Sequence, residues 1–327
     1  MRAAAALLIA GLVAGPVAVV GGCSAGEQSS VAGHPPATSR ASSTPSSGAT
    51  APPTSPTHSP GHPRPLRVAV ALDAVTHLAR TIGPRHATSP AFARAARWLA
   101  AQFRRAGYVV HAQRFPVPGG NSWGVPVPAG SSVNVVATPP GFDSRSPHLV
   151  IGAHLDTVPQ SPGDDDDASG IGVLLMVADA LAGTAAAGRL PVVLVGFGAE
   201  EPRGPTDADH HYGSRSYVAR LSPAERRAVR GMLALDRVGV GDAVPVCTAG
   251  DDAAQAQVLR AGRRAGVPMR PCVNRSSDHW SFVERGMPGV RLGGTSYAAY
   301  HSADDLPSVE NGAQLRRTAR LVLAWSR

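Results

Sequence analysis

Histidine, aspartate and glutamate side chains gather in five short segments of the sequence, and these are residue types that bind metal ions. In chain order they are His154 and Asp156, Asp164 to Asp167, Glu200 and Glu201, Asp236, and His301. Imidazole and carboxylate ligands without a thiolate are typical of catalytic zinc sites. Two metal ions that share one bridging carboxylate are a common means of activating water. The set therefore indicates a catalytic metal centre.

Apolar segments predict the buried elements that would position these residues. Strands are expected at 133–138, 148–156, 190–201 and 231–241, and helices at 66–82, 89–108, 169–183, 253–266 and 318–327. Strands that alternate with helices indicate a single-domain α/β/α sandwich around a mostly parallel mixed sheet. Ligands bind at the carboxyl ends of the strands in such sheets. At least three of the five segments stand directly after a predicted strand, which favours one shared site.

Composition and charge narrow the functional class. The chain has 327 residues, of which 43% are hydrophobic and 17% charged, as expected for a folded protein with a sizeable core. The net charge of +8 comes from arginines that are scattered along the sequence. The sequence contains no zinc-finger, helix-turn-helix or RNA-recognition pattern, so we expect no nucleic-acid partner.

The N-terminus has the pattern of an export signal. Residues 1–22 hold one arginine, a long apolar stretch and a small-residue end before Cys23. The tetrapeptide "VGGC" resembles the bacterial lipobox, which implies a lipid on Cys23 and a membrane lipoprotein that faces outward. An ordinary secretion signal or an uncleaved anchor is the alternative. Residues 23–65, rich in Ser, Thr and Pro, predict a disordered linker, and residues 66–327 the folded domain.

Two further cysteines, Cys247 and Cys272, stand in the predicted domain. An exported protein can form disulfides, but the spacing alone does not decide between a bridge and two free thiols. Both states remain open at this point.

Five motifs taken in order resemble the M28 family of zinc aminopeptidases. They are "HLDT", "DDASG", "GAEE", "ALDRVG" and "YHSADD". The segment "SSDHWSFVERGMPGV" and the opening helices are also similar to the family, so that the likeness covers about residues 66–327. The resemblance implies a phosphorylase/hydrolase-like zinc exopeptidase fold and two zinc ions per chain.

The resemblance also implies which residues bind the metal ions. One ion would bind His154, Asp166 and Asp236, and the other would bind Asp166, Glu201 and His301. Asp166 would therefore bridge the two ions, although its neighbours are also aspartates and the register within the run is open.

Three further residues receive catalytic roles from the same resemblance. Glu200 would be the general base that takes a proton from the attacking water and delivers it to the leaving amine. Asp156 would orient the imidazole of His154. Tyr300 is a candidate hydroxyl donor to the oxyanion.

The remaining polar residues near these motifs have simpler interpretations. Asp164 and Asp165 are expected in a solvated loop, because like charges resist burial. Asp278 is expected to cap the helix that follows it, near the wall of the site. His210 and His211 are expected as loop residues rather than as further ligands.

We therefore expect an exported metalloaminopeptidase that acts on peptides with a free N-terminus. Three alternatives stay open: a glutaminyl-peptide cyclotransferase on the same fold, a carboxypeptidase, and a non-catalytic binding domain. The sequence does not define the side-chain preference, and it leaves the oligomeric state open, with a monomer as the expectation.

Overall fold

The computed structural model describes residues 63–184, 189–250 and 252–327. The predicted signal segment, Cys23 and nearly all of the predicted linker lie outside these residues. Among the residues described, no helix has both the length and the apolar character needed to cross a membrane.

The main sheet has eight strands in the order β1-β4-β6-β5-β7-β10-β8-β9. Four of its seven neighbouring pairs are parallel, and three are antiparallel. The strands are β1 (Val109–Val117), β4 (Gly130–Thr138), β5 (His148–His154), β6 (Val192–Phe197), β7 (Val229–Leu235), β8 (Val244–Thr248), β9 (Met269–Val273) and β10 (Gly289–Leu292). A separate hairpin consists of β2 (Gly120–Ser122) and β3 (Val125–Val127).

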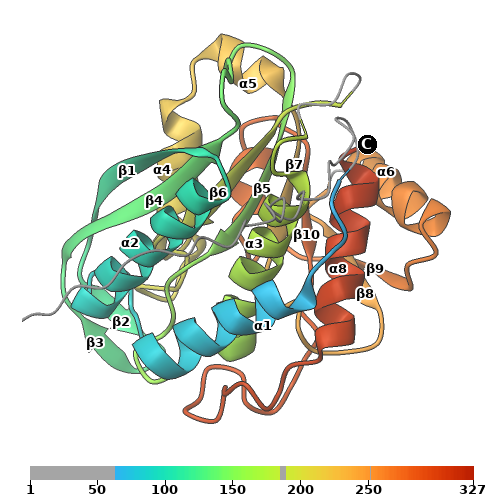
Figure 1. The fold of residues 1–327 in the computed structure, drawn as a ribbon. Coiled ribbons are helices and arrows are strands. Elements are labelled where there is room, and N and C mark those ends of the chain that lie inside the picture. The colour runs from blue at the N-terminus through green and yellow to red at the C-terminus, as the bar shows by residue number, and fades with distance from the viewer. Residues whose placement is uncertain (1–62, 185–188, 251) are drawn as a thin grey trace, which may run out of the picture. The chain divides into compact units, whose positions relative to one another are not determined.

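Helices cover both faces of this sheet (Figure 1). One face carries α1 (Val68–Thr76), η1 (His77–Ile82), α2 (Pro90–Arg105), α3 (Ser169–Leu181), α6 (Asp252–Arg264) and α8 (Gly312–Trp325). The other face carries α4 (Tyr212–Arg220), α5 (Pro223–Ala228) and α7 (His279–Val283). Two short turns, η2 (Asp164–Ala168) and η3 (Asp207–Asp209), complete the elements. The predicted α/β sandwich around a mixed sheet is confirmed.

Local sequence signals explain where several elements begin and end. Ser89 caps α2, because its hydroxyl accepts a hydrogen bond from the backbone amide of Phe92 at 3.0 Å. Pro90 occupies the first helical position, where its missing amide costs nothing. Gly107 follows the helix with a φ of 89°, a conformation that glycine adopts without strain. The helix predicted over 89–108 is thus confirmed.

The central strands are buried on both faces, as their uninterrupted apolar sequences predicted. Every residue of β5 and of β6 is buried. At Gly152 in β5, a Cβ atom would lie 2.2 Å from the ring of Phe197 in β6. This close approach requires glycine, and it holds the ends of two adjacent parallel strands in register.

Cys247 and Cys272 form a disulfide bond between β8 and β9. Of the two states that the sequence left open, the structure has the bridged one. The bond joins directly opposite residues at the sheet edge that lies farthest from β1.

Candidate metal centre

Four adjacent parallel strands bring the predicted site residues to one edge of the sheet. His154 is the last residue of β5, Glu200 and Glu201 follow β6, and Asp236 follows β7. His301 lies in the connection from β10 to α8. Because β6, β5, β7 and β10 are neighbours and run in the same direction, their carboxyl ends meet there.

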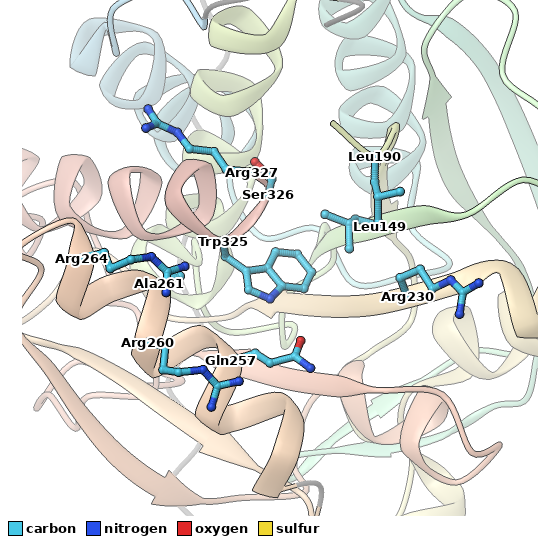
Figure 2. A pocket seen from close by; sticks show the side chains of 10 residues that line it. All are labelled: Leu149, Leu190, Arg230, Gln257, Arg260, Ala261, Arg264, Trp325, Ser326 and Arg327. Carbon is cyan, nitrogen blue, oxygen red and sulfur yellow. The ribbon is translucent and has the colours of Figure 1, made fainter. Parts of the chain in front are cut away.

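A pocket at the opposite ends of the strands is a different feature (Figure 2). Its lining includes Leu149 near the start of β5 and Arg230 near the start of β7, around the indole of Trp325. Its ten lining residues include no histidine, aspartate or glutamate. This pocket therefore lacks the metal-binding residue types that gather at the carboxyl ends of these strands.

Asp166 lies between the two predicted histidine ligands. Its Oδ1 is 3.0 Å from Nε2 of His154, and its Oδ2 is 3.0 Å from Nε2 of His301. Oε2 of Glu201 is 3.5 Å from the same nitrogen of His301. Ligand atoms of His154, Asp166 and Glu201 all lie within 4.8 Å of one another. The two oxygens of one carboxylate thus face two separate imidazoles.

The electrostatics of this centre are dominated by burial. Burial opposes the ionisation of Asp166, but hydrogen bonds from His154 and His301 outweigh it and hold the pKa of its carboxyl well below the usual range. Burial raises the pKa of Glu201 to about 7, and the charge of Asp166 adds to the shift. A cation would relieve this repulsion between neighbouring carboxylates.

The acidic run is buried throughout, so the expectation of a solvated loop for Asp164 and Asp165 was wrong. Asp164, Asp165 and Asp167 are fully buried, and Asp166 is 4% exposed. Burial raises the pKa of Asp164 to about 8 and that of Asp165 to about 7. A charge run in sequence carries no sign of the backbone amides that make such burial possible.

Backbone amides from distant segments hold the run in place. Oδ1 of Asp165 accepts a hydrogen bond from the amide of Gly239 at 2.7 Å. Asp167 accepts from the amides of His154 at 3.1 Å, Gly170 at 3.0 Å and Arg237 at 3.2 Å. The carboxylate of Asp167 therefore connects the end of β5, the start of α3 and the end of β7. The peptide bond between Asp166 and Asp167 is cis.

Asp305 also holds the acidic run in place, through the backbone amides of the run itself. It is fully buried, and its carboxylate accepts hydrogen bonds from the amides of Asp165 at 3.0 Å and Asp166 at 3.3 Å. Asp305 stands four residues after His301 in the connection to α8. It therefore couples the position of the Asp166 carboxylate to the segment that carries His301, another predicted ligand.

Asp156 lies beside His154, but its carboxylate contacts the segment of the predicted base. Its Oδ1 accepts from the amide of Glu200 at 3.0 Å, and its Oδ2 accepts from the amide of Glu201 at 3.3 Å. Nδ1 of His154 is 3.1 Å from the backbone carbonyl oxygen of Asp156 and 3.9 Å from its carboxylate. Asp156 thus orients the imidazole through its main chain and the Glu200–Glu201 segment through its side chain.

Glu200 is 7% exposed and lies close to His211. Burial raises the pKa of Glu200 to about 8, although the neighbouring His154 opposes the shift. Nε2 of His211 is 3.1 Å from Oε1 of Glu200, and the amide of His211 donates to the carbonyl oxygen of Glu200 at 3.0 Å. His211 is therefore part of the site wall and more than the loop residue that the sequence predicted.

Asp278 precedes α7 but makes no side-chain capping hydrogen bond, so the prediction of a cap was wrong. Its side chain is 1% exposed. Burial and the charge of Glu200 raise the pKa of Asp278 to about 7. The expected proximity to the wall of the site agrees with this electrostatic coupling.

Asp236 is paired with arginine at the carboxyl end of β7. Its Oδ1 accepts a hydrogen bond from Arg291 at 2.7 Å and lies 3.6 Å from Nε of Arg237. Burial opposes the ionisation of Asp236, but Arg291 leads the opposing interactions, and the pKa of Asp236 is lowered. An ionised Asp236 keeps Oδ2 for a further partner.

Tyr300 is partly exposed and lies beside His301. Its ring stacks on that of His301, with 3.7 Å between the centroids, and the guanidinium of Arg237 lies 4.2 Å from its centroid. Burial of much of the ring raises the pKa of its hydroxyl. Tyr300 is therefore a neutral hydroxyl donor at physiological pH.

The residues present suit zinc. Oε1 of Glu201 and Nδ1 of His301 are buried and have no hydrogen-bond partner, and such groups are costly unless something satisfies them. Imidazoles and carboxylates supply the donors, and the described cysteines are paired with each other. This donor chemistry matches zinc in open, catalytic sites.

Four residues that contact the candidate site were not among the site residues predicted from the sequence, namely Asp305, Arg291, Arg237 and His211. Asp305 is the last residue of the quoted motif "YHSADD", so its membership of that motif was a usable signal. Arg291 lies inside an apolar strand, and its partner is 55 residues away. No local pattern connects the two.

Replacing Asp305 by alanine should weaken zinc binding about 10- to 100-fold, as loss of a residue that orients metal ligands commonly does. The physical reason is that the amides of Asp165 and Asp166 lose their acceptor. Zinc affinity would be measured by competition with a chelating dye. Asp304→Ala is the matched control, because Asp304 is the exposed neighbour, and equal affinities in the two variants would refute this role for Asp305.

Comparison with known proteins places these observations in a family. The uncharacterized protein YfbL of Escherichia coli (strain K12) is 31% identical over 180 residues, which are 52% of this chain and 50% of that protein. The chain thus spans about half the length of the curated relative it matches.

Two solved structures share the fold. The zinc aminopeptidase BSAP from Bacillus subtilis has a TM-score of 0.69 at 18% identity, covering 80% of this chain and 94% of that one. The glutaminyl cyclase of Porphyromonas gingivalis has a TM-score of 0.67 at 19% identity, and the match covers 80% of this chain and 97% of that one. The sequence model of peptidase family M28 matches residues 134–326, a segment that contains all the predicted site residues. The chain belongs to peptidase family M28.

Proposed function

We propose that the chain is a zinc-dependent exopeptidase that removes N-terminal residues from peptides. The observation that carries this proposal is the position of Asp166, whose two oxygens each lie 3.0 Å from a different histidine. A carboxylate placed in this way suits a bridge between two metal ions. Membership of a peptidase family and the aminopeptidases among the structural neighbours support the same reaction class.

Two ligand sets share this bridge. His154 and Asp236 would complete the first set, and Glu201 and His301 the second. Zinc bound there would polarise the scissile carbonyl and lower the pKa of a water molecule. Oδ2 of Asp236, the oxygen that Arg291 does not bind, and the unpartnered Oε1 of Glu201 are suitable donors on the two sides.

The chain's own residues supply the proton transfers. The Glu200 carboxylate takes a proton from the attacking water while the water oxygen bonds to the scissile carbon. The same carboxyl then gives that proton to the leaving nitrogen as the carbon–nitrogen bond breaks. Burial raises the pKa of Glu200, whereas the positive charge of bound zinc would lower it, so that the carboxyl can take up a proton and release it again. Asp156 keeps Glu200 in place through the backbone amide.

Two further groups complete the assignment. The hydroxyl of Tyr300 donates a hydrogen bond to the oxyanion of the tetrahedral addition product. The free α-amine of the substrate is held by the carboxylates of Glu200 or Asp236. An acetylated N-terminus removes that positive charge and adds bulk, so it should be a poor substrate.

Glutaminyl-peptide cyclisation is the second candidate. It is favoured by one observation, which is that the compact ligand group consists of His154, Asp166 and Glu201 while Oδ1 of Asp236 is engaged by Arg291. This arrangement would also suit a single ion. The fold neighbour from Porphyromonas gingivalis has the name of this activity.

A substrate panel separates the candidate functions. We expect the zinc-loaded full chain to hydrolyse unblocked aminoacyl p-nitroanilides in a chelator-sensitive way and to leave N-acetylated ones intact. Glu200→Gln should keep its zinc yet lose at least about 100-fold in kcat, because it removes the general base. Cyclisation of a glutaminyl peptide without hydrolysis would support the second candidate. Inactivity on every substrate would favour a non-catalytic binding domain.

Metal stoichiometry tests the two ligand sets. We expect about two zinc ions per chain in the wild type and about one in Asp236→Asn, because Asp236 belongs to only one set. Elemental analysis after dialysis against dilute zinc gives the count. Asp242→Asn is a suitable control, since Asp242 is exposed and pairs with the exposed Arg270. One ion in the wild type would contradict the two-metal assignment.

We propose from Cys23 that the enzyme is located at the membrane. A lipid on this residue would tether the chain to the outer face of the membrane, with residues 24–65 as a spacer. Cys23→Ser expressed in a bacterial host should move the protein from the membrane fraction to the soluble fraction, whereas Ser24→Ala should not. Unchanged fractionation of the serine variant would leave a secreted form or an uncleaved anchor as the explanation.

A further inference from the structure

An exposed tryptophan lies directly against the candidate metal centre. Trp123 is 56% exposed, yet its ring centroid is 4.4 Å from that of His301 in an edge-to-face arrangement. The ring centroid of Tyr300 lies 6.1 Å from that of Trp123, and Tyr300 is 36% exposed. Large apolar side chains on a protein surface are informative where they border a binding site.

The backbone of Trp123 is strained. Trp123 and Gly124 form the two-residue turn between β2 and β3, with φ values of 50° and 88°. Such turns favour Asn-Gly or Gly-Gly, because both positions require positive φ, and a bulky residue there is an outlier. The side chain of Asn121 stabilises the turn by accepting from the amide of Gly124 at 2.7 Å. Strain of this kind is often found at functional sites.

The hairpin is also tied to the catalytic segment. The amide of Asn121 donates to the carbonyl oxygen of Arg203 at 3.0 Å, and a Cβ on Gly120 would lie 1.9 Å from that oxygen. The guanidinium of Arg203 donates to the carbonyl oxygens of Pro118 and Pro128, at 3.4 and 3.0 Å. Arg203 follows Glu201 by two residues, so the turn that presents Trp123 is held relative to the proposed base.

We propose that Trp123 binds an apolar side chain of the peptide substrate next to the scissile bond. This inference rests on the proposed exopeptidase function. The indole contacts His301 on one side and leaves more than half of its surface exposed beside the reacting groups. An aliphatic or aromatic substrate side chain would cover that surface, whereas glycine or alanine would leave it exposed. The enzyme should therefore prefer large apolar residues.

The test compares substrates within each variant. For Trp123→Ala, the ratio of kcat/KM for leucyl over alanyl substrates should fall about tenfold, the scale of discrimination expected from apolar pocket contacts. In Trp123→Phe, which keeps an aromatic ring, this ratio should fall less. The dipeptides Leu-Ala and Ala-Leu, each compared with Ala-Ala, identify whether the first or the second residue contacts the indole. Val273→Ala, at a position that is 78% exposed on β9, is the control and should not change the ratio.

A purely structural role for Trp123 predicts a different result. Loss of support for His301 would lower zinc content and reduce kcat/KM for all substrates by the same factor, and an unchanged ratio in Trp123→Ala would overturn the proposal. The affinities for leucine hydroxamate and glycine hydroxamate, measured by calorimetry, give the same comparison without turnover. A wild type that binds leucine hydroxamate in preference but hydrolyses no peptide would contradict the proposed function alone, while equal binding of the two compounds would contradict the role of Trp123.

Discussion

Burial of negative charge at the carboxyl edge of the sheet is the constraint on which the site depends. The carboxylates of Asp164 to Asp167, Glu200, Glu201 and Asp236 are all at least nine-tenths buried. A buried carboxylate without a partner is unfavourable by several kcal/mol. Each ionised member therefore needs a cation or a set of amides: His154 and His301 serve Asp166, and Arg291 serves Asp236. Metal ions are the natural further counter-charge for such a concentration of acids.

The same acids join the elements of the fold. Asp167 accepts hydrogen bonds from amides in β5, in α3 and in the segment after β7. Asp156 accepts from two amides in the segment after β6, and Asp305 joins the acidic run to the connection before α8. Each hydrogen bond satisfies a backbone donor at a strand or helix end, where no ladder partner exists. Ordering the ligands and closing the ends of the sheet are consequently one physical process, which explains why the loops of the site are buried.

The sequence was informative wherever the signal was local. Ser89 with Pro90 predicted the start of α2, and the apolar runs of β5 and β6 predicted strands whose ends carry polar residues. Outer strands such as β1 and β9 have mixed exposure and no comparable run, so they were not predicted. The burial of Asp164 and Asp165 was missed because their stabilising amides come from segments far along the chain. The roles of Arg291 and His211 were also missed, because each contacts a carboxylate that no local sequence pattern connects to it.

The β2–β3 hairpin differs from the metal centre in how it is built. The candidate metal centre is assembled from the ends of β5, β6 and β7 together with η2 and the connection from β10 to α8, and a change in one predicted ligand alters charges that several neighbours share. The hairpin lies outside the main sheet and meets the centre mainly through the ring of His301 and the backbone of Arg203. The tip of the hairpin can therefore change with less effect on the strands that carry the predicted ligands, whereas Gly120 is fixed by its close approach to Arg203. A segment of this kind suits a role in substrate preference, because loops held by a rigid scaffold can alter what is bound while the reacting groups keep their positions.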